Sequence, residues 1–230
     1  MSVRVEREGA VRRVRLDAGK RNALDLEVIR ALREALAPES DAPVAILSGR
    51  TDGFSVGLDN AVLAGSPRDR EALLYEMGAL LVEVLRGPTR LVSVCEGHAV
   101  AAGAMLLLIS DVRIGIEGDH QIGFTEPRMG MTLPALPVLL ARQRLARRQL
   151  HALTVLGRTV RPDEGVRAGF LDEVHPTSSD VEAAASAAAI ELSQLDEAAY
   201  QGTLRTVWGS TVEGMARSVE AQRARLDAVR

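Results

Sequence analysis

The feature that most constrains the fold is an alternation, over the first 116 residues, of short apolar runs and longer segments with helical spacing. Apolar and charged side chains alternate on both sides of Gly9-Ala10, which predicts a β-hairpin with one solvated face. Strands are predicted at residues 3–8, 11–16, 44–47, 91–94 and 112–116, and helices at 25–36, 68–85 and 101–109. Strand and helix therefore follow each other in turn, which favours an α/β layered core with some parallel pairing.

Two other segments have their own patterns. Residues 49–57 are rich in Gly, Asp and Ser and are predicted to be a loop. After Pro134 the pattern is mostly helical: residues 181–195 are rich in alanine, a strong helix former, and residues 198–230 form a long charged helical tail. Such a tail either packs on its own core or contacts other subunits, and the sequence leaves both open.

Composition excludes several classes of protein. The 230 residues are 47% hydrophobic and 26% charged, which is enough for one sizeable core. The net charge of −3 gives no basic excess for binding nucleic acid. Cys95 is the only cysteine and lies in a strand-like run, so we expect a buried small hydrophobe in a reducing compartment. The charged N-terminus is unlike a signal peptide, and the most apolar run, residues 99–109, is too short to span a bilayer. We expect a cytoplasmic protein.

Familiar catalytic motifs are missing from the sequence. It has no GxGxxG after a strand, no phosphate-binding GxxxxGKS and no GxSxG, and its four histidines lack metal-ligand spacing. Two glycine-containing loops remain, each after a strand: GRTDGFSVGLDN (residues 49–60) and EGHAVAAGAM (residues 96–105). Small residues at a helix start leave backbone amides open, so two such loops can each direct one N–H at one carbonyl oxygen. The alternative is that these residues serve close packing.

Five separated segments resemble the crotonase superfamily, the enoyl-CoA hydratase/isomerase family. They are KRNALD (20–25), GFSVGLDN (53–60), EGHAVAAGAM (96–105), GFTEPRMGMTLP (123–134) and GRTVRPDEGVRAGFLDEV (157–174). The resemblance implies a spiral of β-β-α repeats with an acyl-CoA site in residues 1–175. It also implies that residues 176–230 form a helical region that assembles trimers or dimers of trimers.

The resemblance further implies a CoA thioester substrate, with no other cofactor and no metal. The thioester oxygen would accept hydrogen bonds from the backbone amides of Leu58 and Ala102. The CoA entrance would be lined by Lys20, Arg21, Ala23, Val56 and Asn60. For Lys20 and Arg21 a solvated turn is the alternative reading.

The resemblance also assigns the acid chemistry. Many hydratases of the family carry one glutamate where Met105 stands here and a second where Glu126 stands, so this chain keeps one of two acids. A single base can move a proton from C2 to C4, whereas hydration is better served by two carboxylates. We therefore expect a Δ3-Δ2-enoyl-CoA isomerase with Glu126 as the proton shuttle, its pKa raised by burial among apolar neighbours. The alternative is an enoyl-CoA hydratase, or a divergent acyl-CoA hydratase or lyase of the family, with His98, Glu96 or Asp59 as substitute groups. An inactive acyl-CoA-binding protein is the third reading.

Overall fold

A mixed α/β core is built on a six-stranded sheet in the computed structural model, which describes residues 2–51 and 53–229 without the side chain of Lys20. The strand order is β1-β2-β4-β7-β9-β11. β1 and β2 pair antiparallel as the predicted hairpin, and the other neighbours pair parallel. The strands are β1 (Val3–Glu8), β2 (Val11–Leu16), β4 (Val44–Ser48), β7 (Arg90–Cys95), β9 (Val112–Ile116) and β11 (Glu173–His175).

Two smaller sheets sit beside the large one. One has the order β10-β8-β5 and is parallel throughout, with strands β5 (Gly53–Ser55), β8 (His98–Val100) and β10 (Ile122–Gly123). The other pairs β3 (Ala23–Leu24) with β6 (Gly57–Leu58). The chain thus places β4, β7 and β9 in the large sheet, and sends the strand that follows each of them into the three-stranded sheet.

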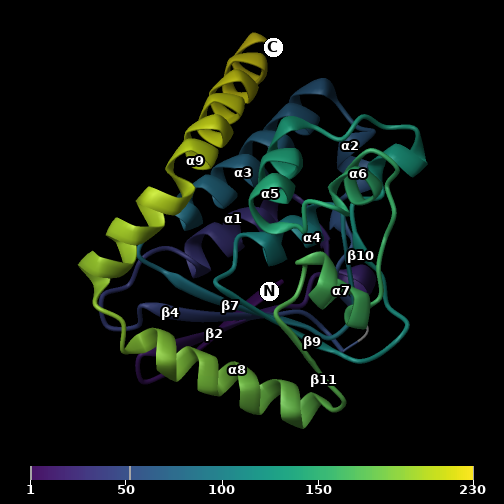
Figure 1. Ribbon diagram of the computed structural model, residues 1–230. Coiled ribbons are helices and arrows are strands. Elements are labelled where there is room, and N and C mark those ends of the chain that lie inside the picture. Colours follow the sequence, from purple (N-terminus) through teal and green to yellow (C-terminus); the bar gives the residue numbers. More distant parts are fainter. Residues whose placement is uncertain (1, 52, 230) are drawn as a thin grey trace.

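Helices cover both faces of the large sheet (Figure 1). On one side lie α1 (Leu26–Ala35), α3 (Pro67–Arg86) and α4 (Ala102–Leu108), with α5 (Ala135–Arg144) and α9 (Glu197–Ala228) beyond them. On the other side α8 (Ser178–Ser193) packs on β4, β7 and β9. The remaining helical segments are short: α2 (Asn60–Leu63), α6 (Leu150–Thr154), α7 (Pro162–Ala168) and the 3-10 turns η1 (Gly19–Arg21) and η2 (Glu126–Met129).

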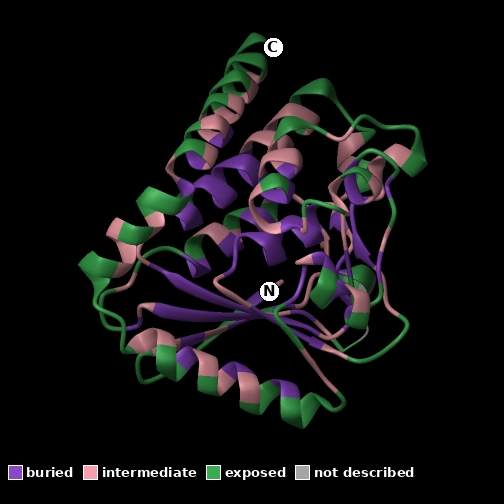
Figure 2. Cartoon of the chain, viewed as in Figure 1, coloured by how far each residue is buried: buried purple, intermediate pink, exposed green. Residues whose placement is uncertain are grey.

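The pleat of the strands produces two hydrophobic cores. In β4, Ala45 and Leu47 belong to the core under α1, α3 and α4, whereas Val44 and Ile46 face α8. The central strands β4 and β7 are therefore buried on both faces, and Figure 2 colours them as buried. Cys95 is fully buried in the first of these cores, which confirms its predicted role.

The C-terminal helices pack on the chain's own core. α9 lies along α3 and α5, and its C-terminal end projects from the body (Figure 1). The proposed boundary at residues 175 and 176 follows the last strand, β11, so both helices of the predicted assembly region lie after the sheet. A contact of this region with other subunits remains a prediction. No helix in the described part of the chain is long and apolar enough to cross a bilayer.

The loop predicted at residues 49–57 is wrong in part, because this segment contains β5 and the start of β6. Both strands are too short to show a period in the sequence, and their pairing with β8 and β3 makes them strands. The predicted helices form within a few residues of their expected ends. Asp25 caps α1, because its Oδ1 accepts the Val28 amide at 2.8 Å.

Candidate active site

The three predicted catalytic residues follow strands that meet at one edge. β5, β8 and β10 are parallel neighbours, so their carboxyl ends point the same way. Leu58 lies beyond the end of β5, Ala102 beyond the end of β8, and Glu126 beyond the end of β10. The Ala101 amide donates to the carbonyl of Gly123 at 2.9 Å, which holds the second and third segments together. Ligands of parallel sheets bind at carboxyl edges of this kind.

The Ala102 amide is open to a ligand. Ala102 is the first residue of α4, so its N–H has no acceptor within the helix, and it donates no hydrogen bond to any other described residue. Gly57 lies directly against this nitrogen: a Cβ at position 57 would be 2.9 Å from it. The φ of Gly57 is +89°, a conformation that side chains disfavour. Glycine at 57 therefore keeps the amide accessible, and Leu58 is the next residue.

Close packing also uses the small residues of this region. A Cβ at Gly103 would lie 2.3 Å from the carbonyl oxygen of Ser55, so α4 can start against β5 only with glycine there. Ala101 has φ of 52° and ψ of −123°, a strained conformation for a residue with a side chain. Close packing therefore explains Gly103, while the role of the Ala102 amide as a donor to a ligand stays a prediction.

Glu126 is a partly buried acid. It begins η2, and its Oε2 atom is buried without a hydrogen-bond partner among the described residues. Burial raises the pKa of Glu126, while hydrogen bonds from backbone amides at Glu126 and Thr125 lower it by a smaller amount. The expected direction of the shift is confirmed. A carboxylate with a raised pKa is a stronger base than an exposed one.

The position where the resemblance expects the other family glutamate is apolar. Met105 lies one turn after Ala102 in α4, is buried, and belongs to the main hydrophobic core. Of the suggested substitutes, Glu96 and His98 lie at the amino end of β8, opposite the edge that leads to Ala102. Asp59 caps α2, because its Oδ1 accepts the Ala61 amide at 2.7 Å.

The residues expected at the CoA entrance gather beside Leu58. The carbonyl of Arg21 accepts the Val56 amide at 3.2 Å, and Ala23 pairs with Gly57 in the two-stranded sheet. Asn60 begins α2 just beyond this pair. Arg21 and Asn60 are exposed, which leaves them accessible to a nucleotide. The side chain of Lys20 lies outside the described part of the structure, so its predicted contact is not placed.

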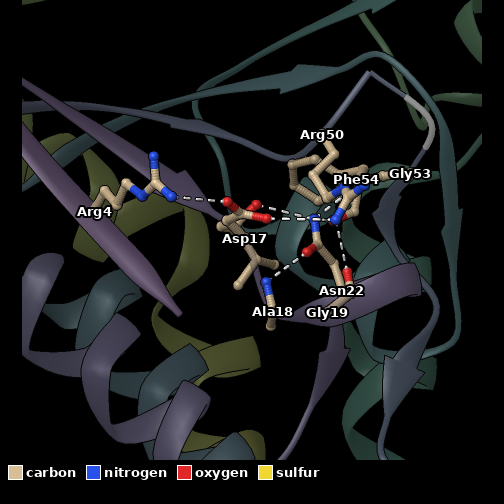
Figure 3. A network of polar contacts seen from close by, with 9 residues as sticks. Arg4, Asp17, Ala18, Gly19, Asn22, Arg50, Gly53 and Phe54 are labelled. Carbon is tan, nitrogen blue, oxygen red and sulfur yellow. Dashed lines mark hydrogen bonds and ion pairs between the residues drawn. The ribbon is translucent and has the colours of Figure 1, made fainter. Parts of the chain in front are cut away.

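Asn22 is an organising residue that the sequence analysis did not single out. It is fully buried with φ of 49°, a left-handed conformation that Asn tolerates better than most residues. Its Nδ2 donates to the carbonyls of Leu16, Gly53 and Phe54 at 3.0, 3.1 and 3.2 Å (Figure 3). Its Oδ1 accepts the Ala18 amide at 2.8 Å. The sequence feature that points to this role is the position of Asn22 within KRNALD, just before α1, which Asp25 caps.

Asn22 also connects this loop to the Gly57 turn. Its carbonyl accepts the Ser55 hydroxyl at 2.7 Å, and the same hydroxyl accepts the Gly57 amide at 3.1 Å. On the outer side of the loop Asp17 pairs with Arg4 and Arg50 at 3.2 and 3.5 Å (Figure 3). A hydrogen-bond chain thus fixes the backbone that carries Leu58.

Comparison with known proteins identifies the family. The family model of enoyl-CoA hydratase/isomerase matches residues 6–224, and the chain belongs to this family of enzymes. Among curated proteins, cyclohexa-1,5-dienecarbonyl-CoA hydratase of Thauera aromatica is 28% identical over 80% of this chain and 70% of its own length. The chain spans 53% to 70% of the length of three curated relatives that it matches.

Solved structures show the same fold. An enoyl-CoA hydratase/isomerase family protein from Pseudomonas syringae is 30% identical, with 98% of both chains covered and a TM-score of 0.90. An enoyl-CoA isomerase from Mycobacterium tuberculosis is 27% identical, with 97% of this chain and 98% of that chain covered and a TM-score of 0.90. The relatives therefore include proteins named for hydration and for isomerisation.

Proposed function

We propose that this chain is a Δ3-Δ2-enoyl-CoA isomerase, which moves a double bond from the 3 to the 2 position of an acyl-CoA thioester. One observation carries the proposal. The Glu126 carboxylate follows a strand at the edge where the Ala102 amide is open, while the apolar Met105 stands where the resemblance expects another family acid.

The proposed reaction needs one base and one oxyanion site. The Glu126 carboxylate removes a proton from C2, and the electron pair moves onto the thioester oxygen as an enolate. The amides of Leu58 and Ala102 hold that oxygen, and Glu126 returns the proton to C4 as the double bond forms between C2 and C3. A donor at such an oxygen contributes about 3–4 kcal/mol. A positioned base contributes about 10²–10⁴-fold. No second acid is required.

The direct test compares two carboxylate variants. The purified protein should convert 3-hexenoyl-CoA to 2-hexenoyl-CoA, followed by the rise of the conjugated thioester absorbance. Glu126→Gln should abolish the conversion. Glu96→Gln is the matched control, because Glu96 also has a buried unpartnered oxygen, Oε1, but lies at the amino end of β8. Full activity in Glu126→Gln, or equal loss in both variants, would refute the role of Glu126.

Hydration is the second candidate, and the Thauera aromatica relative named as a hydratase favours it. Met105 weighs against it, because a buried thioether cannot hold or deprotonate water. Incubation with crotonyl-CoA distinguishes the two: a hydratase consumes the conjugated double bond, whereas an isomerase leaves it. A protein that binds both thioesters and converts neither would be the inactive binding protein of the third reading.

The proposal extends to assembly and location. We propose a homotrimer or hexamer in the cytoplasm, with CoA entering only as part of the substrate. Exposed apolar side chains on the C-terminal helices, Ile190 and Val207, support further contacts between copies. Light scattering of the purified chain would give its mass in solution, and a monomer at all concentrations would exclude the assembly.

A further inference from the structure

A cavity of about 630 Å³ lies beside the segment that carries Glu126. It is bounded by the loop after η2 and by α5 and α6. Much of the lining is apolar and comes from Met131, Leu133, Val138, Leu150 and Val155. Its size and apolar walls are typical of a site for a small organic ligand.

The cavity is also basic. Arg142, Arg147 and His151 line it, and no acidic side chain of the described residues does. Both arginines are exposed, and neither side chain forms a hydrogen bond or ion pair with another described residue. Unpaired like charges around one hollow repel each other, so a bound anion would relieve the repulsion. Guanidinium groups bind carboxylates through paired hydrogen bonds.

The cavity and the candidate active site lie on either side of the same short segment, η2. Pro127, which directly follows Glu126, lines the cavity. Met131 also lines it, and its amide donates to the carbonyl of Glu126 at 2.9 Å. The residues expected at the CoA entrance belong to other elements, namely η1, the β3–β6 pair and α2. The basic cavity is therefore formed by a part of the chain separate from the expected nucleotide side.

We propose that this cavity receives the far end of the acyl group and that the acyl group ends in a carboxylate. The inference rests on the proposed function, because it deepens the substrate class of the same site. Apolar walls contact the methylene chain, and Arg142 and Arg147 bind the terminal carboxylate. Thioesters of dicarboxylic acids would then be preferred over thioesters of the same length that end in a methyl group.

The test is a binding comparison that needs no turnover. Hexanoyl-CoA and adipoyl-CoA share the CoA moiety and a six-carbon acyl chain, and differ only in the terminal carboxylate. Calorimetry on the whole 230-residue chain at low salt should show roughly tenfold tighter binding of adipoyl-CoA, as expected for a charged hydrogen-bonded contact. Arg142→Gln and Arg147→Gln should reduce this preference, because they should weaken adipoyl-CoA binding more than hexanoyl-CoA binding. Arg148→Gln is the matched control, because Arg148 is exposed nearby but does not line the cavity.

Each outcome decides the inference. Equal affinity of the wild-type protein for the two thioesters would overturn it. Equal weakening of both by Arg142→Gln would mean that the arginines bind the CoA phosphates, which also overturns it. No effect of either variant, as expected if a second copy of the chain covers the cavity, overturns it as well. If the wild-type protein prefers adipoyl-CoA but does not isomerise 3-hexenoyl-CoA, the proposed reaction is refuted. The inference that the cavity binds a carboxylate then still stands.

Discussion

Replacement of Gly57 by alanine tests the open amide directly. The added Cβ would lie 2.9 Å from the Ala102 nitrogen and 2.9 Å from the Ala101 Cβ, closer than such atoms approach in proteins. The substrate oxygen would lose access to this donor. Removal of one donor from an oxyanion site costs about 10²–10³ in kcat. We expect Gly57→Ala to lose activity on 3-hexenoyl-CoA by a factor in that range.

The same substitution also destabilises the fold, and this effect must be separated from catalysis. The φ of +89° costs an alanine about 1–2 kcal/mol. Overpacking against α4 adds about 1–3 kcal/mol. The expected loss is therefore about 2–5 kcal/mol, and each kcal/mol lowers Tm by about 2–4 °C for a chain of this size.

Gly9→Ala is the matched control. Gly9 has φ of +59° in the β1–β2 hairpin, and a Cβ there would have no neighbour within 4 Å. This variant should lose only the conformational term, about 1–2 kcal/mol, and keep the wild-type kcat. Urea unfolding measures the stability of both variants, and the rate of double-bond migration measures kcat well below their unfolding range. A Gly57→Ala protein that stays folded with the kcat of Gly9→Ala would refute an oxyanion role for the Ala102 amide.

Three further predictions concern single residues. Because burial raises the pKa of Glu126 above its unfolded value, the folded state binds more protons between the two pKa values, and this carboxyl lowers stability as pH rises through that window. Urea unfolding at pH 4 and at pH 8 measures the free energy of unfolding of Glu126→Gln relative to wild type. This difference should favour the variant more at pH 8 than at pH 4, by about 1.4 kcal/mol for each unit by which burial raises the pKa. No change of the difference with pH would contradict the burial of Glu126. Ala101→Gly should raise Tm, because it releases a strained backbone conformation that costs about 1–3 kcal/mol. The greater entropy of the unfolded glycine chain opposes this gain by only about 0.5–1 kcal/mol. A lower Tm would show that the alanine is unstrained. Burial raises the pKa of Cys95 to about 12, so a disulfide reagent at pH 8 should label it only on unfolding, and rapid native labelling would place the thiol at the surface.

The local patterns of the sequence were sufficient for the long elements. The β1–β2 hairpin, α1 and α3 follow from alternation and helical spacing. The motif resemblance identified the family and drew attention to Leu58, Ala102 and Glu126. These features were predictable because each depends on residues within a few positions of each other.

The short strands and their alignment were decided by the tertiary structure. β5, β8 and β10 have three, three and two residues, too few to display a period, and form only because distant segments supply their hydrogen-bond partners. The role of Asn22 likewise depends on carbonyls at positions 16, 53 and 54, which the sequence does not bring together.

The sequence by itself determined the fold class and the family, and it drew attention to Met105 as a position where the resemblance expects an acid. Only the tertiary structure placed the Ala102 amide against Gly57, buried Glu126 Oε2 without a partner in the described part of the chain, and gathered Arg142, Arg147 and His151 around one cavity. The physical reason is the distance along the chain over which each kind of interaction acts. Hydrophobic period and turn chemistry act between neighbours along the chain, whereas burial, desolvation and the convergence of charges depend on which remote segments pack together.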